Sequence, residues 1–266
     1  ILYGATDLAT LYQRMRDESP DEVLYVVDKR QGLHFEQVFR VAYKSEIVPA
    51  STKLHFIGFG TMNGSDGKPF KTRDGGVMAL QDLIQQLIDG AGNRLEQQQR
   101  YVDEKTLETI ALAVGVGALK FGDLCNLPER DYVFDLEQFA SFEGKTGPYI
   151  QYAAVRIASI LSKLGATDEG SYTILDPKTD AEKKLMLKLS MFSAWVDLAA
   201  ANYQPSKICD FVFELCQTFN HFYHEVHILS EPDHDRQMSY QMLLKLSQKV
   251  ILKSLELLGI DHLEQM

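Results

Sequence analysis

EVLYVV, residues 22–27, is a short apolar run suited to a buried strand of a parallel sheet. Apolar residues at helical spacing follow it between Leu33 and Ala42, and a second strand is predicted near 53–59. A strand, a helix and a strand at this pitch form the crossover unit of a doubly wound sheet. The sequence around this stretch therefore predicts an α/β fold.

The residues before this strand favour a helix. Thr6 is expected to cap its start, and the apolar pattern ends near Asp17. The chain begins with Ile1-Leu2-Tyr3, which is apolar and follows no initiator Met. We interpret these three residues as a strand that has been cut open, and we expect the chain to be a fragment of a longer protein.

The residues after the second strand change character. Residues 61–76 are rich in Gly, Asp and Lys, and loops of this length inside compact domains are usually functional. From Val77 onward we expect no strands. Asp180 and Glu182 near one helix start and Gly259 beyond the last helix fit helix polarity. Helices are predicted at 78–100, 104–125, 147–164, 178–202, 205–228 and 234–259, with prolines near the breaks. The expected fold class is α/β followed by an all-α helical bundle.

The composition is that of a globular protein. The chain has 266 residues, of which 45% are hydrophobic and 24% are charged, and no apolar run approaches the length of a membrane span. The net charge of −10 argues against indiscriminate binding to nucleic acid. Residues 131–266 alone carry 12 Lys and Arg against 19 Asp and Glu. Any contact with RNA must therefore come from local geometry and stacking.

Three cysteines, Cys125, Cys209 and Cys216, have no metal-binding spacing and form no even disulfide framework. Cys209 and Cys216 stand seven residues apart in a helical pattern, so both are expected to face the core. Reduced, buried thiols are typical of a cytosolic protein.

Three short segments carry a resemblance to a known family. Residues 3–7 read YGATD, residues 30–34 read RQGLH, and residues 67–73 read GKPFKTR. Their order and spacing resemble those of the arginyl-tRNA synthetases, which are class I aminoacyl-tRNA synthetases. The resemblance implies an arginine–tRNA ligase, which attaches arginine to tRNA(Arg) with ATP. It also implies a partial Rossmann-like catalytic domain followed by an anticodon-binding domain.

The third segment resembles the mobile ATP loop of class I synthetases, whose consensus is Lys-Met-Ser-Lys-Ser. Lys68 and Lys71 match both lysines, Thr72 replaces the final serine, and Pro69 and Phe70 depart from the common Met-Ser. The resemblance implies that Lys68 and Lys71 are catalytic and that both bind ATP together with Thr72. Flexible ammonium groups can meet the pyrophosphate as its charge develops. The alternative is a solvated surface turn.

The first two segments correspond to the arginine pocket of the family. The resemblance implies that Tyr3, Asp7 and Gln31 bind arginine, with Tyr3 and Asp7 across a strand-to-helix junction. A planar guanidinium can donate a fork of hydrogen bonds to one carboxylate, which Asp7 would supply. In the alternative, Asp7 only stabilises the helix dipole and Tyr3 packs. His34 is expected to line the ATP side of the pocket or to cap its helix.

The segment SFEGKTGPYIQY, residues 141–152, and then Arg156 resemble the opening of the family's anticodon-binding bundle. Tyr149, Tyr152 and Arg156 are spaced to share one helix face, on which unstacked bases can lie. The resemblance implies that these three residues and Met266 contact the anticodon. Phe222 and Tyr223 are expected on the same surface. A stripe of buried tyrosines is the alternative.

The resemblance divides the chain into a catalytic part (1–93), a helical connector (94–130) and an anticodon-binding domain (131–266). It implies tRNA(Arg), arginine and ATP as partners, with Mg²⁺ accompanying ATP and no metal held by the protein. A cytoplasmic monomer without a membrane partner is expected. Class I enzymes also need a His-x-Gly-His signature, which none of the seven histidines makes. We therefore expect these residues alone to be unable to activate arginine.

Other functions remain open at this point. The chain could be a free-standing RNA-binding or regulatory module without catalysis. His221, His224 and His227 could suggest a metalloenzyme, but their spacing spreads the rings around a helix and is not the His-Glu-x-x-His zinc motif. Cysteinyl or other class I synthetases have similar helical domains, and Tyr3, Asp7 and Gln31 are what favour arginine.

Overall fold

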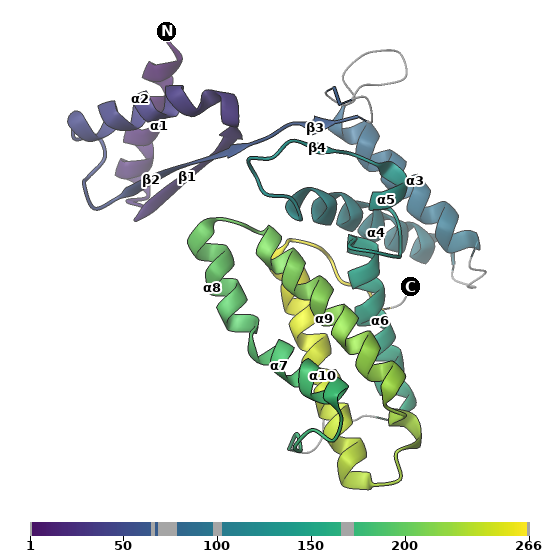
Figure 1. Cartoon of the computed structure of the whole chain (residues 1–266). Helices are drawn as coiled ribbons and strands as arrows, with labels where there is room; N and C mark the ends of the chain where they lie inside the picture. Colours follow the sequence, from purple (N-terminus) through teal and green to yellow (C-terminus); the bar gives the residue numbers. More distant parts are fainter. Residues whose placement is uncertain (1, 65–66, 69–78, 98–102, 166–172, 265–266) are drawn as a thin grey trace. The chain divides into compact units, whose positions relative to one another are not determined.

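The computed structural model describes residues 2–64, 67–68, 79–97, 103–165 and 173–264 (Figure 1). The chain divides into two compact units. The first unit comprises residues 1–70 with 127–134, and the second comprises residues 71–126 with 135–266. Within the described residues, no helix is both long and apolar enough to span a bilayer.

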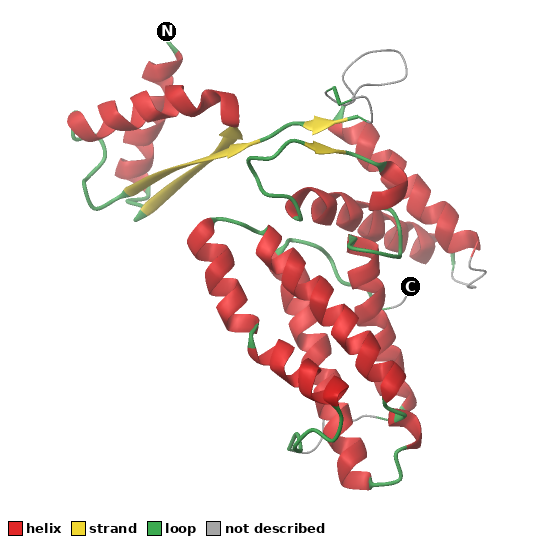
Figure 2. Ribbon diagram, in the orientation of Figure 1, coloured by secondary structure: helices red, strands yellow, loops and turns green. Residues whose placement is uncertain are grey.

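The first unit is built on two parallel strands joined through a helix (Figures 1 and 2). The elements in chain order are α1 (Tyr3–Asp17), β1 (Glu22–Asp28), the 3-10 turn η1 (Lys29–Gln31), α2 (Gly32–Lys44) and β2 (Lys53–Phe59). Val23 of β1 pairs with Leu54 of β2, and the register continues in parallel along both strands. The predicted strand, helix and strand are confirmed.

Both helices pack on one face of this sheet. Leu11 of α1 and Val38 and Ala42 of α2 are buried together, with Tyr25 of β1 and Leu54 of β2 packed against them. Side chains alternate between the two faces of a strand, so the neighbouring positions point away from the helices.

The opposite face of the sheet differs from the expectation of a fully buried strand. Leu24 is 46% exposed and Val26 is 60% exposed. Their partners across the sheet, His55 and Ile57, are half-buried. The composition of EVLYVV predicted the strand correctly. It does not reveal that the described residues cover only one of its faces.

The start of the chain also differs from the expectation. Tyr3 is the first residue of α1, and Leu2 precedes it as the N-cap, so Tyr3 does not belong to a strand. Thr6 lies inside the helix, where its hydroxyl donates to Tyr3 O at 2.7 Å. The amides of Ala5 and Thr6 both donate to Leu2 O, so the N-cap is Leu2 and the helix begins four residues earlier than predicted.

Two further strands were not predicted. β3 (Met62–Asn63) pairs in parallel with β4 (Tyr132–Val133), so the expectation of no strand after Val77 is wrong. Each strand has two residues, which is too short for any alternation of apolar and polar residues to show.

The second unit is helical. The predicted helices are present, except that 178–202 forms two helices separated at Met191 and 205–228 ends in a separate 3-10 turn. The short α5 was not predicted. The elements are α3 (Leu80–Gln97), α4 (Glu104–Leu124), α5 (Leu136–Phe139), α6 (Gly147–Lys163), α7 (Asp180–Ser190), α8 (Phe192–Asn202), α9 (Ser206–Glu225), η2 (Ile228–Ser230) and α10 (His234–Leu257).

Side chains define the ends of these helices. Thr146, Thr179 and Asp233 accept backbone hydrogen bonds at the starts of α6, α7 and α10. Gly259 has a φ of +65°, which suits glycine and closes α10. Asp180 and Glu182 lie in the first turn of α7. The predicted fit of these two residues and of Gly259 to helix polarity is therefore confirmed.

The core of the second unit lies among α6, α7, α9 and α10 (Figure 1). Phe211, Leu215 and Phe219 of α9 are fully buried in it. The α3–α4 hairpin forms a smaller core, which Val155 of α6 joins. Cys209 and Cys216 are completely buried, as predicted, and burial raises the pKa of both thiols.

Candidate functional site

The structure brings the first two motif segments into contact. His34 Nε2 lies 2.6 Å from Asp7 Oδ2, so a proton on that nitrogen bonds the two side chains. Asp7 comes from α1 and His34 from the first turn of α2, which follows β1. Both side chains are about one third exposed, at 29% for Asp7 and 34% for His34. Residues 27 positions apart in the sequence therefore form one polar site.

The positions of Asp7 and His34 in their helices argue against a helix-dipole role for Asp7 and a capping role for His34. Since α1 begins at Tyr3, its first turn contains no acidic residue, and Asp7 lies beyond the reach of the strongest helix-dipole effect. Gln31, not His34, occupies the N-cap position of α2. Among the described residues, Asp7 Oδ1 has no hydrogen-bond partner.

Tyr3 and Gln31 lie one turn from this pair. Tyr3 precedes Asp7 by four residues in α1, which places both on the same helix face. Its side chain is 86% exposed, so it does not pack as the alternative required. Gln31 is exposed at the start of α2, three residues before His34.

The sequence analysis did not predict a second contact near Asp7 and His34, between Arg14 and Tyr25. Arg14 Nη1 donates to Tyr25 Oη at 3.2 Å, and the guanidinium lies 5.5 Å from the ring centroid. Burial raises the pKa of Tyr25, with the nearby charge of Asp7 adding to the effect and Arg14 opposing it. The spacing of seven between Asp7 and Arg14 on one helix was the available signal.

Two backbone hydrogen bonds join the described residues of the predicted ATP loop. The Gly64 amide donates to Lys68 O at 2.8 Å, and the Gly67 amide donates to Gly64 O at 2.9 Å. Gly67 has a φ of +73°, in the left-handed region that favours glycine. Lys68 is exposed. Lys71 and Thr72 lie outside the described residues.

The predicted tRNA face in the second unit contains a connected cluster. Asn220 of α9 bridges two residues of α6: its Nδ2 donates to Tyr149 Oη at 2.9 Å, and its Oδ1 accepts from Arg156 Nη1 at 3.1 Å. The Arg156 guanidinium lies 4.9 Å from the ring centroid of Tyr223. Tyr149, Arg156, Asn220 and Tyr223 form what we call the Asn220 cluster.

The remaining predicted tRNA residues lie differently. Tyr152 is 38% exposed on α6. Phe222 is completely buried against Tyr240, so the expectation that it contributes to the surface is wrong. On α9, Phe222 lies on the apolar face, whereas Asn220 and Tyr223 lie at its border. Met266 is outside the described residues. Sequence reasoning missed Asn220, although it stands beside the aromatic residues that were considered.

The three histidines of α9 and the loop after it do not gather. His221 Nε2 lies 3.9 Å from Glu225 Oε2 on the exposed side of α9. Across the described ranges, no group of three His, Cys, Asp or Glu side chains could hold a metal ion.

The chain is similar to known proteins along its whole length. Residues 1–136 match the family model described as tRNA synthetases class I (R), catalytic domain, and residues 150–266 match the DALR anticodon binding domain. The chain is 50% identical over all 266 residues to the arginine–tRNA ligase of Alkaliphilus oremlandii, of which it covers 45%. It is 46% identical to the arginine–tRNA ligase of Agathobacter rectalis, of which it covers 46%. The chain thus spans less than half the length of these relatives.

Solved structures share the fold. The arginyl-tRNA synthetases of Plasmodium falciparum and Thermus thermophilus each match with a TM-score of 0.82 at 24% identity, over 99% and 100% of this chain. The matches cover 44% and 49% of those two chains. Because the catalytic family model covers half of the sequence, the chain belongs to the family of class I tRNA synthetases (R).

Proposed function

We propose that the chain is part of an arginine–tRNA ligase, which attaches arginine to tRNA(Arg) with ATP. The contact between Asp7 and His34 carries this proposal from the structure, because it joins the two segments that the pocket requires. The names of the relatives, which are 50% and 46% identical across the whole chain, support the same activity.

Asp7 is the proposed anchor of the arginine side chain. A carboxylate accepts two hydrogen bonds from the edge of a guanidinium, which lysine cannot imitate. His34 holds Asp7 Oδ2, while Oδ1 has no partner among the described residues. Tyr3, one turn earlier, would offer an aromatic face or a hydroxyl, and Gln31 an amide oxygen.

Lys68 and Lys71 are the proposed catalytic cations. During activation, the arginine carboxylate attacks the α-phosphorus of ATP and pyrophosphate leaves. Ammonium groups that reach the departing oxygens stabilise this charge in the transition state. Thr72 and His34 are proposed to contact ATP. Mg²⁺ would arrive with ATP, since it prefers phosphate oxygens and water to a cage of protein ligands.

The second unit is the proposed reader of the anticodon. Tyr152 and Arg156 of α6 would stack on unpaired bases, and Tyr149 and Met266 would line the same surface. This accounts for RNA recognition by an acidic chain. The match to an anticodon binding domain supports this role.

The proposed functional segments are a catalytic part (1–93), a connector (94–130) and an anticodon-binding domain (131–266). The family models, which cover 1–136 and 150–266, support this order of functions. We further propose a cytoplasmic monomer, consistent with buried, unpaired Cys209 and Cys216. Sedimentation at micromolar concentration tests the oligomeric state.

A chimera tests the activity. Residues 1–266 would replace the matching segment of the Alkaliphilus oremlandii relative. The chimera is expected to catalyse arginine-dependent pyrophosphate exchange and to arginylate tRNA(Arg), whereas the 266 residues alone should do neither. Lys71→Ala in the chimera should lower the activation rate and change tRNA affinity by less than about twofold.

Two results would contradict the proposal. Activation of another amino acid in preference to arginine would remove the pocket. Specific binding of tRNA by the chain, together with an inactive chimera and an active parent enzyme, would favour a non-catalytic RNA-binding module.

A further inference from the structure

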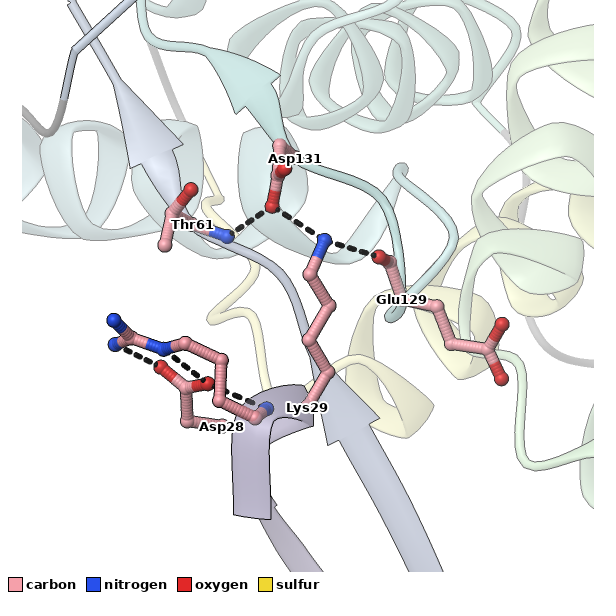
Figure 3. Close-up of polar contacts among 6 residues, drawn as sticks. Asp28, Lys29, Thr61, Glu129 and Asp131 are labelled. Atoms are coloured by element: carbon pink, nitrogen blue, oxygen red, sulfur yellow. Dashed lines mark hydrogen bonds and ion pairs between the residues drawn. The ribbon is translucent and has the colours of Figure 1, made fainter. Parts of the chain in front are cut away.

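Lys29, the first residue after β1, reaches the segment that contains β4. Its Nζ lies 2.8 Å from Asp131 Oδ1 and 3.2 Å from Glu129 O. Figure 3 shows the Lys29 side chain extending from the end of β1 toward both acceptors. One ammonium group therefore links two parts of the first unit that are 102 residues apart in the sequence.

The same carboxylate oxygen also holds the start of β3. Asp131 Oδ1 accepts a hydrogen bond from the Thr61 amide at 2.7 Å (Figure 3). The bonds from Lys29 and from the Thr61 amide favour the charged carboxylate and lower the pKa of Asp131 to about 2. Asp131 is therefore ionised, and joined to both donors, throughout the physiological pH range.

Beside this contact, the backbone at Gly60 lies close to the backbone of residues 128–130. The Gly60 amide donates to Pro128 O at 2.8 Å. A Cβ at Gly60 would lie 2.5 Å from the carbonyl carbon and oxygen of Arg130, so only glycine allows the two backbones to come this near.

Backbone hydrogen bonds continue from this contact along β3 to Lys68. The amides of Tyr132 and Phe134 donate to Thr61 O and Asn63 O, at 3.1 and 2.8 Å. The next residue, Gly64, donates its amide to Lys68 O at 2.8 Å. An unbroken series of hydrogen bonds and adjacent residues thus leads from Lys29 to Lys68.

We propose that Lys29 and Asp131 are positioning residues that fix the first loop lysine, Lys68, relative to the carboxyl end of β1. The importance of this position for catalysis rests on the proposed function of Lys68. Neither Lys29 nor Asp131 needs to touch a substrate for this role. Their effect reaches the reaction through the backbone of residues 60–64.

Global stabilisation is a poor explanation for this pair. The side chains of Lys29 and Asp131 are 41% and 46% exposed. Ion pairs at such exposure contribute little to the stability of a fold. The consequences of breaking the pair should therefore be local, at β3 and at the hydrogen bond between Gly64 and Lys68.

Hydrogen exchange in the 266-residue chain tests the proposal. Lys29→Met keeps the stem of the side chain and removes its charge. The Gly64 amide should then exchange about tenfold faster, while the melting temperature stays within about 2 °C. Gly64 is the informative amide because neither Lys29 nor Asp131 bonds to it, so a change there must have travelled along β3.

Three variants control this measurement. Lys29→Arg should keep the slow exchange, because a guanidinium can also bridge a carboxylate and a carbonyl. Asp131→Ala also removes the acceptor of the Thr61 amide, so exchange at Gly64 should be at least as fast as in Lys29→Met. Arg40→Met removes an exposed ion pair with Glu36 on α2, in the same unit, and should leave Gly64 unchanged. Unchanged exchange at Gly64 in both Lys29→Met and Asp131→Ala would overturn the proposal.

The chimera supplies a second readout. Lys29→Met should lower kcat of pyrophosphate exchange about tenfold and leave the KM for arginine within about twofold. An unchanged kcat would overturn the positioning role in catalysis. If the unmutated chimera proves inactive, the proposed function fails, and the Gly64 measurement still decides whether Lys29 and Asp131 hold Lys68.

Discussion

The two candidate sites are built in opposite ways. The Asn220 cluster lies on a packed bundle, where α6 and α9 share a large apolar core and Tyr149 packs against Phe213. The Asp7–His34 pair joins the second turn of α1 to the first turn of α2, beside a sheet of which the described residues cover only one face, and the neighbouring Tyr3 is 86% exposed.

This difference separates two ways of preparing a binding site. The core orients the side chains of the Asn220 cluster before any ligand arrives, which lowers the entropy cost of binding. In the first unit Asp7 and His34 orient each other, whereas Tyr3 and Gln31 are exposed. We expect packing of α6 and α9 to keep the Asn220 cluster in place, and the contact with His34 to keep Asp7 in place.

The largest effect is expected from the core of the second unit. Phe219→Ala removes a completely buried ring and should lower the free energy of unfolding by about 3–5 kcal/mol. Val26→Ala changes a residue of β1 that is 60% exposed and should change this free energy by less than about 0.5 kcal/mol. Urea unfolding of the chain measures both. Similar losses in the two variants would remove the contrast between the units.

The second-largest loss of stability is expected from breaking the buried ion pair between Arg236 and Glu182 in the second unit. Arg236 Nη1 lies 3.1 Å from Glu182 Oε1 and donates to Asp176 O at 2.8 Å, and the two charged side chains are almost completely buried. Arg236→Met leaves the buried Glu182 without its cation and should lower the free energy of unfolding, measured in urea, by about 3–5 kcal/mol.

A double variant controls this prediction. Glu182→Met combined with Arg236→Met removes both charges and should regain most of the lost stability, because no unpaired charge stays buried. A double variant as unstable as Arg236→Met alone would show that packing, not charge, determines the effect.

The tRNA site should show a smaller effect. Arg156→Met removes the guanidinium that contacts both Asn220 and Tyr223 and should weaken tRNA(Arg) binding by about 1–3 kcal/mol. Filter binding with tRNA(Arg) and a tRNA of different anticodon measures the change. Lys163→Met, in the last turn of α6, is the matched control. Equal weakening by both variants would point to bulk charge and not to the cluster.

The pH response of Asp131 sharpens the account of the first unit. The pKa of Asp131 is about 2, below the ordinary value of 3.8. The contribution of its ionised carboxylate to the stability of the first unit is therefore complete above pH 3.8 and is lost as the pH falls through about 2. Lys29 is the main cause, followed by the Thr61 amide. The carboxyl carbon signal of Asp131 should titrate near pH 2 and move toward 3.8 in Lys29→Met. A midpoint near the ordinary value in the unmutated chain would contradict the contact between Lys29 and Asp131.

The sequence predicted most of the architecture and only part of the sites. Repeated apolar spacing predicted β1, α2, β2 and the long helices, because burial of one face leaves a periodic pattern. Two-residue strands leave no such pattern, so β3 and β4 were missed. The exposure of Val26 was missed because a strand's own composition does not tell what covers it.

The site residues divide in a similar way. Asp7 and Gln31 came from resemblance to a family, and the contact of Asp7 with His34 required the fold. Asn220 was missed because the prediction for this part of α9 considered only the aromatic residues Phe222 and Tyr223. No local pattern could pair Lys29 with Asp131, since 102 residues separate them and each alone resembles an ordinary surface charge.

The KM for arginine of Asp7→Asn in the chimera tests the central claim most directly. The amide that replaces the carboxylate can still accept the bond from His34 but lacks the charge that the guanidinium requires, so the KM should rise about tenfold or more. Asp17→Asn, which removes an exposed carboxylate at the other end of α1, should leave it unchanged. A normal KM in Asp7→Asn would contradict the assignment of the arginine pocket.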